Sequence, residues 1–175
     1  TGVQTCALPI SKDAVPPIVM VDSVDELLKR CDGIMIFSLD GRLHRKQAEA
    51  VLRAGKRLFI GRPLASSVDD AVAILQLAQE TKTPCWSSSQ HRFSAGFSGM
   101  RDHPEVGRVI GCDVYGGWTV NAPEPEQFTR PLHSIETLYT IMGPGVTTVS
   151  CTSSPTAETI VAEWADGRIG TYRGI

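Results

Sequence analysis

The sequence has no excess of positive charge and no long apolar run. Its 17 lysines and arginines stand against 19 aspartates and glutamates, which leaves a formal net charge of -2. Proteins that bind nucleic acid or an anionic membrane through surface charge carry a basic field, so the composition argues against both partners. Apolar runs such as Ile34–Phe37 are far shorter than the roughly 20 residues of a membrane-spanning helix. We therefore expect neither a nucleic-acid-binding nor a membrane-spanning protein.

Cysteine pairs and metal-ligand motifs are also missing. The five cysteines include no C-x-x-C pair, and an odd count does not build a disulfide framework. None of them stands at metal-ligand spacing from a histidine, so no metal site is expected. Reduced thiols favour a cytoplasmic protein, and an export signal upstream of the chain is the alternative.

The two ends of the chain do not resemble the ends of a domain. The first residues, TGVQTCALPIS, have no periodicity that continues into the next segment, and we interpret residues 1–11 as a non-native leader. The last residues, GTYRGI, stop within a strand pattern. We therefore interpret the sequence as an internal fragment, which we expect to be inactive alone. Residues 12–90 would end one domain, and residues 91–175 would begin a second, truncated one.

Strand and helix patterns alternate over the first half. Short apolar runs predict strands at 17–21, 33–38, 57–61 and 84–89. Their alternation with helices predicts a partial Rossmann-type parallel sheet, with strands covered on both faces.

Three helices are predicted between these strands. Ser23 and Ser67 each precede an acidic residue at the spacing of a capping box, and Leu43–Ala54 carries a helical stripe that ends at Gly55. The apolar face of the third helix is predicted to comprise Val68, Ala71, Val72, Leu75 and Ala78.

The second half predicts a mostly antiparallel sheet and one helix. Strand patterns occur at 106–117 and 146–154, and a helix is predicted from Ser134 to Met142. In ETIVAEWADGRIGTYRG, apolar residues alternate up to Trp164 and Asp166-Gly167 supplies a hairpin turn. The fold class is therefore predicted as α/β, a partial Rossmann-type sheet followed by a truncated α+β domain.

Several segments together resemble one family. DGRLHRKQAEAVLRAGKRLFIGRPLASSVDDAVAI, SSSQHRFSAGF, VGRVIGCDVYGG, HSIETLYTIMGPG and WADGRIGTYRG follow the order and spacing of the glucose–fructose oxidoreductase / inositol dehydrogenase / MocA (Gfo/Idh/MocA) family. The resemblance covers nearly all of residues 13–175. It implies an NAD(P)-dependent oxidoreductase, acting as a homo-oligomer on a secondary alcohol of a sugar or polyol.

The same resemblance assigns the candidate catalytic residues, with departures from the family pattern. Arg62 stands at the lysine of the E-K-P motif and Pro63 at its proline. In the D-x-G-x-H-x-x-D motif, His133 stands at the histidine and Glu136 at the last aspartate. Thr129 and Pro131 replace the first aspartate and the glycine.

These departures change the expected chemistry. Arginine stays protonated, so Arg62 could orient a hydroxyl or stabilise an alkoxide but could not accept a proton. Proton transfer is then assigned to His133, with Glu136 about one helical turn further on to orient its imidazole. The alternative is a catalytically impaired family member that acts as a carbohydrate-binding or scaffold protein.

The cofactor contacts implied by the resemblance lie in two loops. The candidates for binding NAD or NADP are Ser38, Leu39, Asp40, His44, Gly61, Arg62 and Pro63. A partly exposed His44 and a simple turn at Asp40-Gly41 are the open alternatives. No G-x-G-x-x-G follows a predicted strand, so the phosphate-binding glycine loop would precede residue 13.

The junction of the two predicted domains is the expected place for substrate. Gln90 and Arg92 lie there and are candidate substrate contacts. The neighbouring His91 is interpreted as a surface residue.

Overall fold

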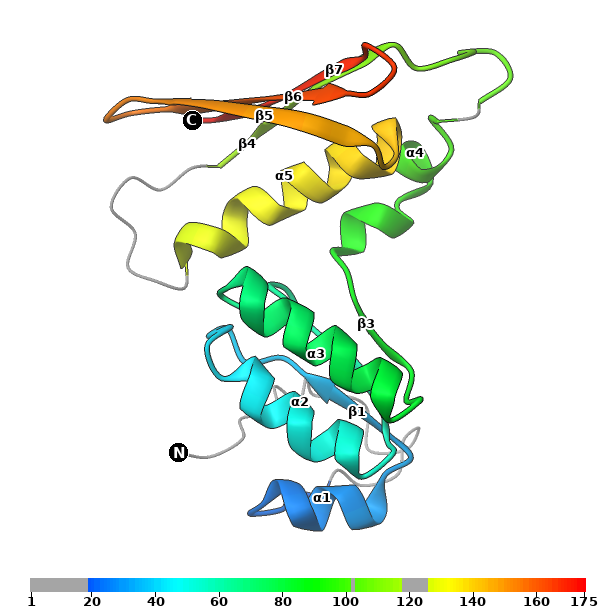
Figure 1. Cartoon of the computed structure of the whole chain (residues 1–175), viewed down its shortest axis with the longest axis vertical. Coiled ribbons are helices and arrows are strands. Elements are labelled where there is room, and N and C mark those ends of the chain that lie inside the picture. Colours follow the sequence, from blue (N-terminus) through cyan, green and yellow to red (C-terminus); the bar gives the residue numbers. More distant parts are fainter. Residues whose placement is uncertain (1–18, 102, 118–125) are drawn as a thin grey trace, which may run out of the picture. The chain divides into compact units, whose positions relative to one another are not determined.

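Figure 1 shows the computed structural model, which describes residues 19–101, 103–117 and 126–175. The predicted leader, residues 1–11, lies outside these ranges. Contacts within the chain divide it into two compact units, Thr1–Ser87 and Ser88–Ile175. The strand predicted at 17–21 is wrong over its described part, because residues 19–21 have no regular structure.

The first unit contains a parallel sheet with the strand order β1-β2-β3. Its described elements follow one another as α1 (Val24–Arg30), β1 (Gly33–Ile36), α2 (His44–Arg53), β2 (Arg57–Ile60), α3 (Val68–Glu80) and β3 (Cys85–Ser87). The prediction of alternating strands and helices around a Rossmann-type parallel sheet is confirmed.

Side-chain caps begin two of these helices, as predicted. The Ser23 hydroxyl accepts a hydrogen bond from the Glu26 amide at 3.2 Å, and the Ser67 hydroxyl accepts one from the Asp70 amide at 3.1 Å. The Asp70 carboxylate pairs with Arg45 of α2 at 2.9 Å, which ties the starts of two helices together.

One face of the parallel sheet forms the core of the first unit. Alternate strand residues point into it, and helices α2 and α3 add their own apolar residues. The buried members are Ile34, Ile36, Ala48, Val51, Leu52, Leu58, Ile60, Ile74 and Ala78. The opposite face carries Met35, Phe37 and Trp86, which are 62%, 64% and 50% exposed. The prediction of strands covered on both faces is therefore wrong for this unit as described.

The buried face of α3 also differs from its prediction. Ile74 and Ala78 are buried, whereas Val68, Val72 and Leu75 are exposed. Several apolar stripes are present on this helix, and the orientation that buries Ile74 is selected by packing against α2 and the sheet.

The second unit is a four-stranded sheet with helices (Figure 1). Its described elements are the 3-10 helix η1 (Gln90–Phe93), α4 (Ala95–Ser98), β4 (Gly111–Gly116), α5 (Glu126–Met142), β5 (Val146–Ser153), β6 (Glu158–Trp164) and β7 (Ile169–Gly174). The strand order is β4-β7-β6-β5, with β4 parallel to β7 and the other neighbours antiparallel. The predicted mostly antiparallel sheet is confirmed.

Helix α5 begins earlier than predicted. It runs through Pro131 from Glu126, although a helix from Ser134 was expected because proline removes a backbone donor and usually ends a helix. His133 therefore lies inside the helix and not at its start.

Helix α5 lies against one face of the sheet of the second unit (Figure 1), and glycines let it approach closely. A Cβ on Gly170 would lie 2.9 Å from the Leu138 side chain and 3.0 Å from the Trp164 ring. A Cβ on Gly116 would overlap the Ser134 hydroxyl. Leu138, Trp164 and the fully buried Tyr172 fill the space between helix and sheet.

Candidate functional site

In the first unit, two loops meet at the carboxyl edge of the parallel sheet. One follows β1 and the other follows β2, and the Gly61 amide donates to the Ile36 carbonyl at 2.8 Å. A Cβ on Gly61 would lie 3.1 Å from the Phe37 ring, and one on Gly41 would lie 2.9 Å from Pro63. Glycine is needed at Gly41, where a Cβ would overlap the neighbouring loop, and a Cβ at Gly61 would be tight against its neighbours. The predicted cofactor residues thus lie in two adjoining loops, except His44, which begins α2.

His44 holds these loops together. Its ring is fully buried, with Nε2 at 2.8 Å from the Ser38 carbonyl oxygen and Nδ1 at 2.9 Å from the Pro63 carbonyl oxygen. Each loop is therefore attached to the first turn of α2 through one imidazole. Full burial rules out the alternative of a partly exposed side chain.

Asp40 forms a turn that its own sequence neighbours complete. Both carboxylate oxygens accept from the Arg42 guanidinium, at 2.7–3.1 Å, and Oδ1 also accepts the Arg42 amide at 3.0 Å. The side-chain bonds to Arg42, followed by its backbone bond, lower the pKa of Asp40 to about 2. The carboxylate is thus charged and already bonded within its own loop, while the adjoining Leu39 is 73% exposed.

Both loops lie at the carboxyl edge of the parallel sheet. Ligands of open α/β sheets bind outside the carboxyl ends of the strands. The loops here supply backbone groups, the exposed Leu39 and the guanidinium of the partly buried Arg62. The Arg62–Pro63 peptide bond is cis.

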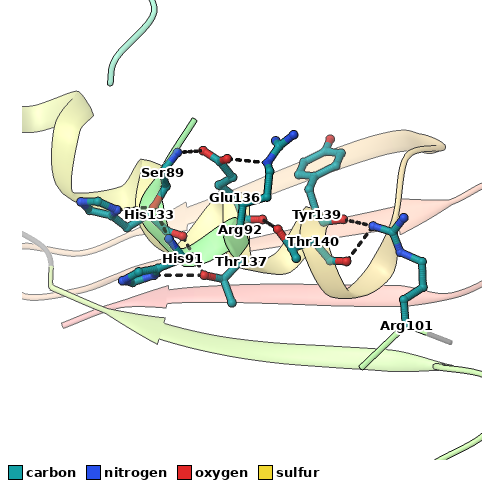
Figure 2. A network of polar contacts seen from close by, with 9 residues as sticks. All are labelled: Ser89, His91, Arg92, Arg101, His133, Glu136, Thr137, Tyr139 and Thr140. Carbon is teal, nitrogen blue, oxygen red and sulfur yellow. Dashed lines mark hydrogen bonds and ion pairs between the residues drawn. The ribbon is translucent and has the colours of Figure 1, made fainter. Parts of the chain in front are cut away.

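The second unit brings together residues from η1, its flanking turn and α5 (Figure 2). The Ser89 hydroxyl lies 2.6 Å from Nδ1 of His133, and Ser89 is fully buried. The Ser89 hydroxyl also accepts the His91 amide at 3.2 Å, which caps η1. Ser89 was not predicted as a site residue, because its bond to His133 spans 44 residues of sequence.

Glu136 supports this arrangement indirectly. Its carboxylate accepts from the Ser89 amide and from Nε of Arg92, both at 2.7 Å (Figure 2). The sequence predicts that Glu136 orients the His133 imidazole. In the structure Ser89 bonds to Nδ1, and Glu136 holds the segment that carries Ser89.

His91 belongs to the same group, although it was interpreted as a surface residue. Its ring lies 4.9 Å from that of His133, centroid to centroid, and its Nδ1 lies 3.2 Å from the Thr137 hydroxyl. That hydroxyl donates to the His133 carbonyl at 2.9 Å, so it accepts from His91. His91 and Thr137 are 46 residues apart in the sequence, so no local pattern could predict this packing.

The two predicted substrate residues differ in their surroundings. Gln90 is exposed, while Arg92 is tied to Glu136 and borders a surface hollow of about 480 Å³. The hollow also contacts Arg101, whose guanidinium donates to the Tyr139 and Thr140 carbonyls at the end of α5 (Figure 2). Thr129, at the position of the family's first aspartate, has no described side chain.

The described part of the chain contains no group of three or more histidine, cysteine, aspartate or glutamate side chains placed to hold a metal ion. None of its helices combines the length and the apolar character needed to cross a bilayer.

A parallel sheet that alternates with helices is the architecture of a Rossmann-type fold, and comparison with known proteins agrees. Residues 8–89 match the GFO_IDH_MocA model, described as an oxidoreductase family with an NAD-binding Rossmann fold. The 1,5-anhydro-D-fructose reductase of Ensifer adhaerens is 31% identical over 117 residues, 59% of this chain and 35% of that protein. The myo-inositol dehydrogenase Hyg17 of Streptomyces leeuwenhoekii is 31% identical over 88 residues, 50% of this chain and 27% of that protein.

Solved structures share the fold. The myo-inositol 2-dehydrogenase of Lactobacillus plantarum has a TM-score of 0.72 at 14% identity, over 88% of this chain and 54% of that one. The WlbA dehydrogenase of Bordetella pertussis, solved with NADH and UDP-GlcNAcA, has a TM-score of 0.72 at 17% identity, over 88% and 52%.

The chain belongs to the Gfo/Idh/MocA oxidoreductase family. Its alignments cover about a third of the curated relatives and about half of the solved chains.

Proposed function

We propose that this chain is part of an NAD(P)-dependent oxidoreductase that interconverts a secondary alcohol and a carbonyl group on a sugar or polyol. The observation that carries the proposal is the convergence of the β1 and β2 loops, joined through His44, at the carboxyl edge of the parallel sheet. Family membership and the names of two relatives support the class of substrate.

We assign cofactor binding, substrate binding and proton exchange to different residues. The loops at Ser38–Asp40 and Gly61–Pro63 would hold the dinucleotide, whose nicotinamide ring supplies hydride exchange when bound. Arg62 would hydrogen-bond the substrate oxygen as a permanent donor. His133 would exchange a proton with that oxygen, and Glu136 and Ser89 would keep its ring in place.

Direct binding tests the cofactor half of this proposal. NADH and NADPH are titrated into the chain and followed by the quenching of tryptophan fluorescence, with His103→Ala as an exposed histidine control. Saturable binding that weakens in His44→Ala and Arg62→Ala, but not in the control, supports the site. Equal affinity in all four proteins would contradict it.

Turnover tests the catalytic half. The natural gene product that contains this chain is assayed with a panel of polyols and their keto forms. We expect His133→Ala to lower kcat by about 100-fold or more, since general acid–base catalysis contributes about that much. Turnover that survives this change would remove His133 from the mechanism.

A second candidate function is a family member that binds carbohydrate without turning it over. Arginine at position 62 favours it, because a guanidinium cannot accept a proton as lysine can. Tight sugar binding with no reduction of NAD(P)+, and with no activity gained by Arg62→Lys, would support this second candidate. The cofactor is NAD or NADP in this proposal, and a homo-oligomeric state and a cytoplasmic location stay predictions.

A further inference from the structure

We propose that Ser89 is a positioning residue for His133: its hydroxyl donates to Nδ1, so that the neutral ring carries its proton on Nε2. The meaning of this for catalysis rests on the proposed function, in which His133 meets the substrate oxygen. The contact between Ser89 and His133 can be tested without a ligand, because both residues belong to the second unit.

The other hydrogen bond of the Ser89 hydroxyl indicates which atom donates in its bond to Nδ1 of His133. The Ser89 oxygen already accepts the His91 amide at 3.2 Å, and its own hydrogen must go to an acceptor. Among the described residues, the acceptor that lies within reach is Nδ1 of His133, at 2.6 Å. The reverse assignment would leave a fully buried hydroxyl hydrogen without an acceptor, which is costly.

The position of Ser89 is set by charged groups of two elements (Figure 2). Glu136 of α5 accepts the Ser89 amide at 2.7 Å and pairs with Arg92 of η1 at the same distance. The backbone of Ser89 is therefore held by Glu136, while its hydroxyl bonds to the His133 ring. The His91 ring packs against that of His133 and limits its rotation.

This tautomer has a consequence for substrate. A neutral ring with its proton on Nε2 offers a donor there, which matches a carbonyl oxygen because that oxygen only accepts. A carboxylate partner would instead have kept the proton on Nδ1 and left Nε2 as an acceptor. When the ring is charged, Nδ1 also carries a proton, so the Ser89 hydroxyl must turn to accept it and its own hydrogen loses Nδ1 as an acceptor. The neutral ring could thus hydrogen-bond a carbonyl oxygen through Nε2, whereas the proton exchange proposed for His133 would need the charged ring as the proton donor.

Nitrogen NMR of the histidine rings tests the tautomer without cofactor or substrate. The chain has four histidines, which single His→Gln variants assign. In the neutral His133 ring we expect Nδ1 to be unprotonated and Nε2 protonated. Ser89→Ala should abolish this preference, Ser89→Cys should retain part of it through a weaker donor, and the exposed Ser98→Ala should not change it. A wild-type ring protonated on Nδ1 overturns the proposal even if the Ser89 variants do not fold.

Kinetics of the natural gene product tests the catalytic consequence. We expect Ser89→Ala to lower kcat by up to about 100-fold and to shift the pH profile, with KM for the cofactor unchanged. Unchanged kcat and pH profile would overturn the positioning role. If the predicted tautomer is found but no variant or wild type turns over substrate, the proposed function fails while the assignment of the Ser89 bond stands.

Discussion

The indole nitrogen of Trp164 donates to the carbonyl oxygen of Gly143 over 2.9 Å, so the end of β6 caps the carboxyl end of α5. Arg168 adds a bond from its guanidinium to the Met142 carbonyl at 2.7 Å. The last carbonyls of a helix lack partners within the helix, and these side chains supply them. The helix that carries His133 and Glu136 is thereby attached to the sheet.

Trp164→Phe should destabilise the second unit by about 1–2 kcal/mol, because it keeps most of the ring but leaves the buried Gly143 carbonyl unpaired. Urea unfolding followed by circular dichroism measures the change. Trp86→Phe is the matched control, since Trp86 is 50% exposed. Equal losses in both variants would mean that ring size, and not the hydrogen bond, matters at Trp164.

Gly170→Ala should also be destabilising, by about 1–3 kcal/mol, because its Cβ would press on Leu138 and the Trp164 ring. Thermal unfolding measures the loss. Gly117→Ala provides the comparison, since a Cβ there meets no atom within 4 Å. A neutral Gly170→Ala would show that α5 can move away from the sheet at little cost.

His44→Ala should destabilise the first unit by on the order of 2 kcal/mol, because the loops lose a buried ring that contacts both of them and a loop carbonyl loses its hydrogen-bond donor. Limited proteolysis should then cut within the loops after β1 and β2 sooner than in the wild type. The exposed His103→Ala serves as the reference. Unchanged cleavage of both loops would contradict a role for His44 in joining them.

The Asp40 carboxylate should titrate near pH 2, since its bonds to Arg42 lower its pKa from 3.8 to about 2. Because the pKa of Asp40 is lower in the folded than in the unfolded state, its charged carboxylate stabilises the fold. This stabilisation is fully present above about pH 4 and is lost as the pH falls toward 2. Arg42→Gln should raise the pKa of Asp40 from about 2 toward 3.8, because the side-chain bond to Arg42 is the largest cause, while the amide of residue 42 still donates to the carboxylate. Carbon NMR of the carboxyl group follows this. An Asp40 titration that is the same in wild type and Arg42→Gln would assign the shift elsewhere.

Local sequence signals were enough for much of the fold. The caps at Ser23 and Ser67 and the turn at Gly167 act within a few residues, so each could be predicted from its own segment. The alternation of strands and helices, and the ordered motifs that resemble the family, are likewise properties of the linear chain. They determined the fold class and the family.

Tertiary structure decided what depends on distant partners. Packing against α2 and the sheet selected Ile74, and not Val72, as the buried side of α3. The partner of His133 is Ser89, 44 residues away, and the Glu136 carboxylate bonds to the Ser89 amide across 47 residues. A side chain chooses among several chemically possible partners only when folding brings one of them within hydrogen-bond distance, and no local pattern encodes that choice.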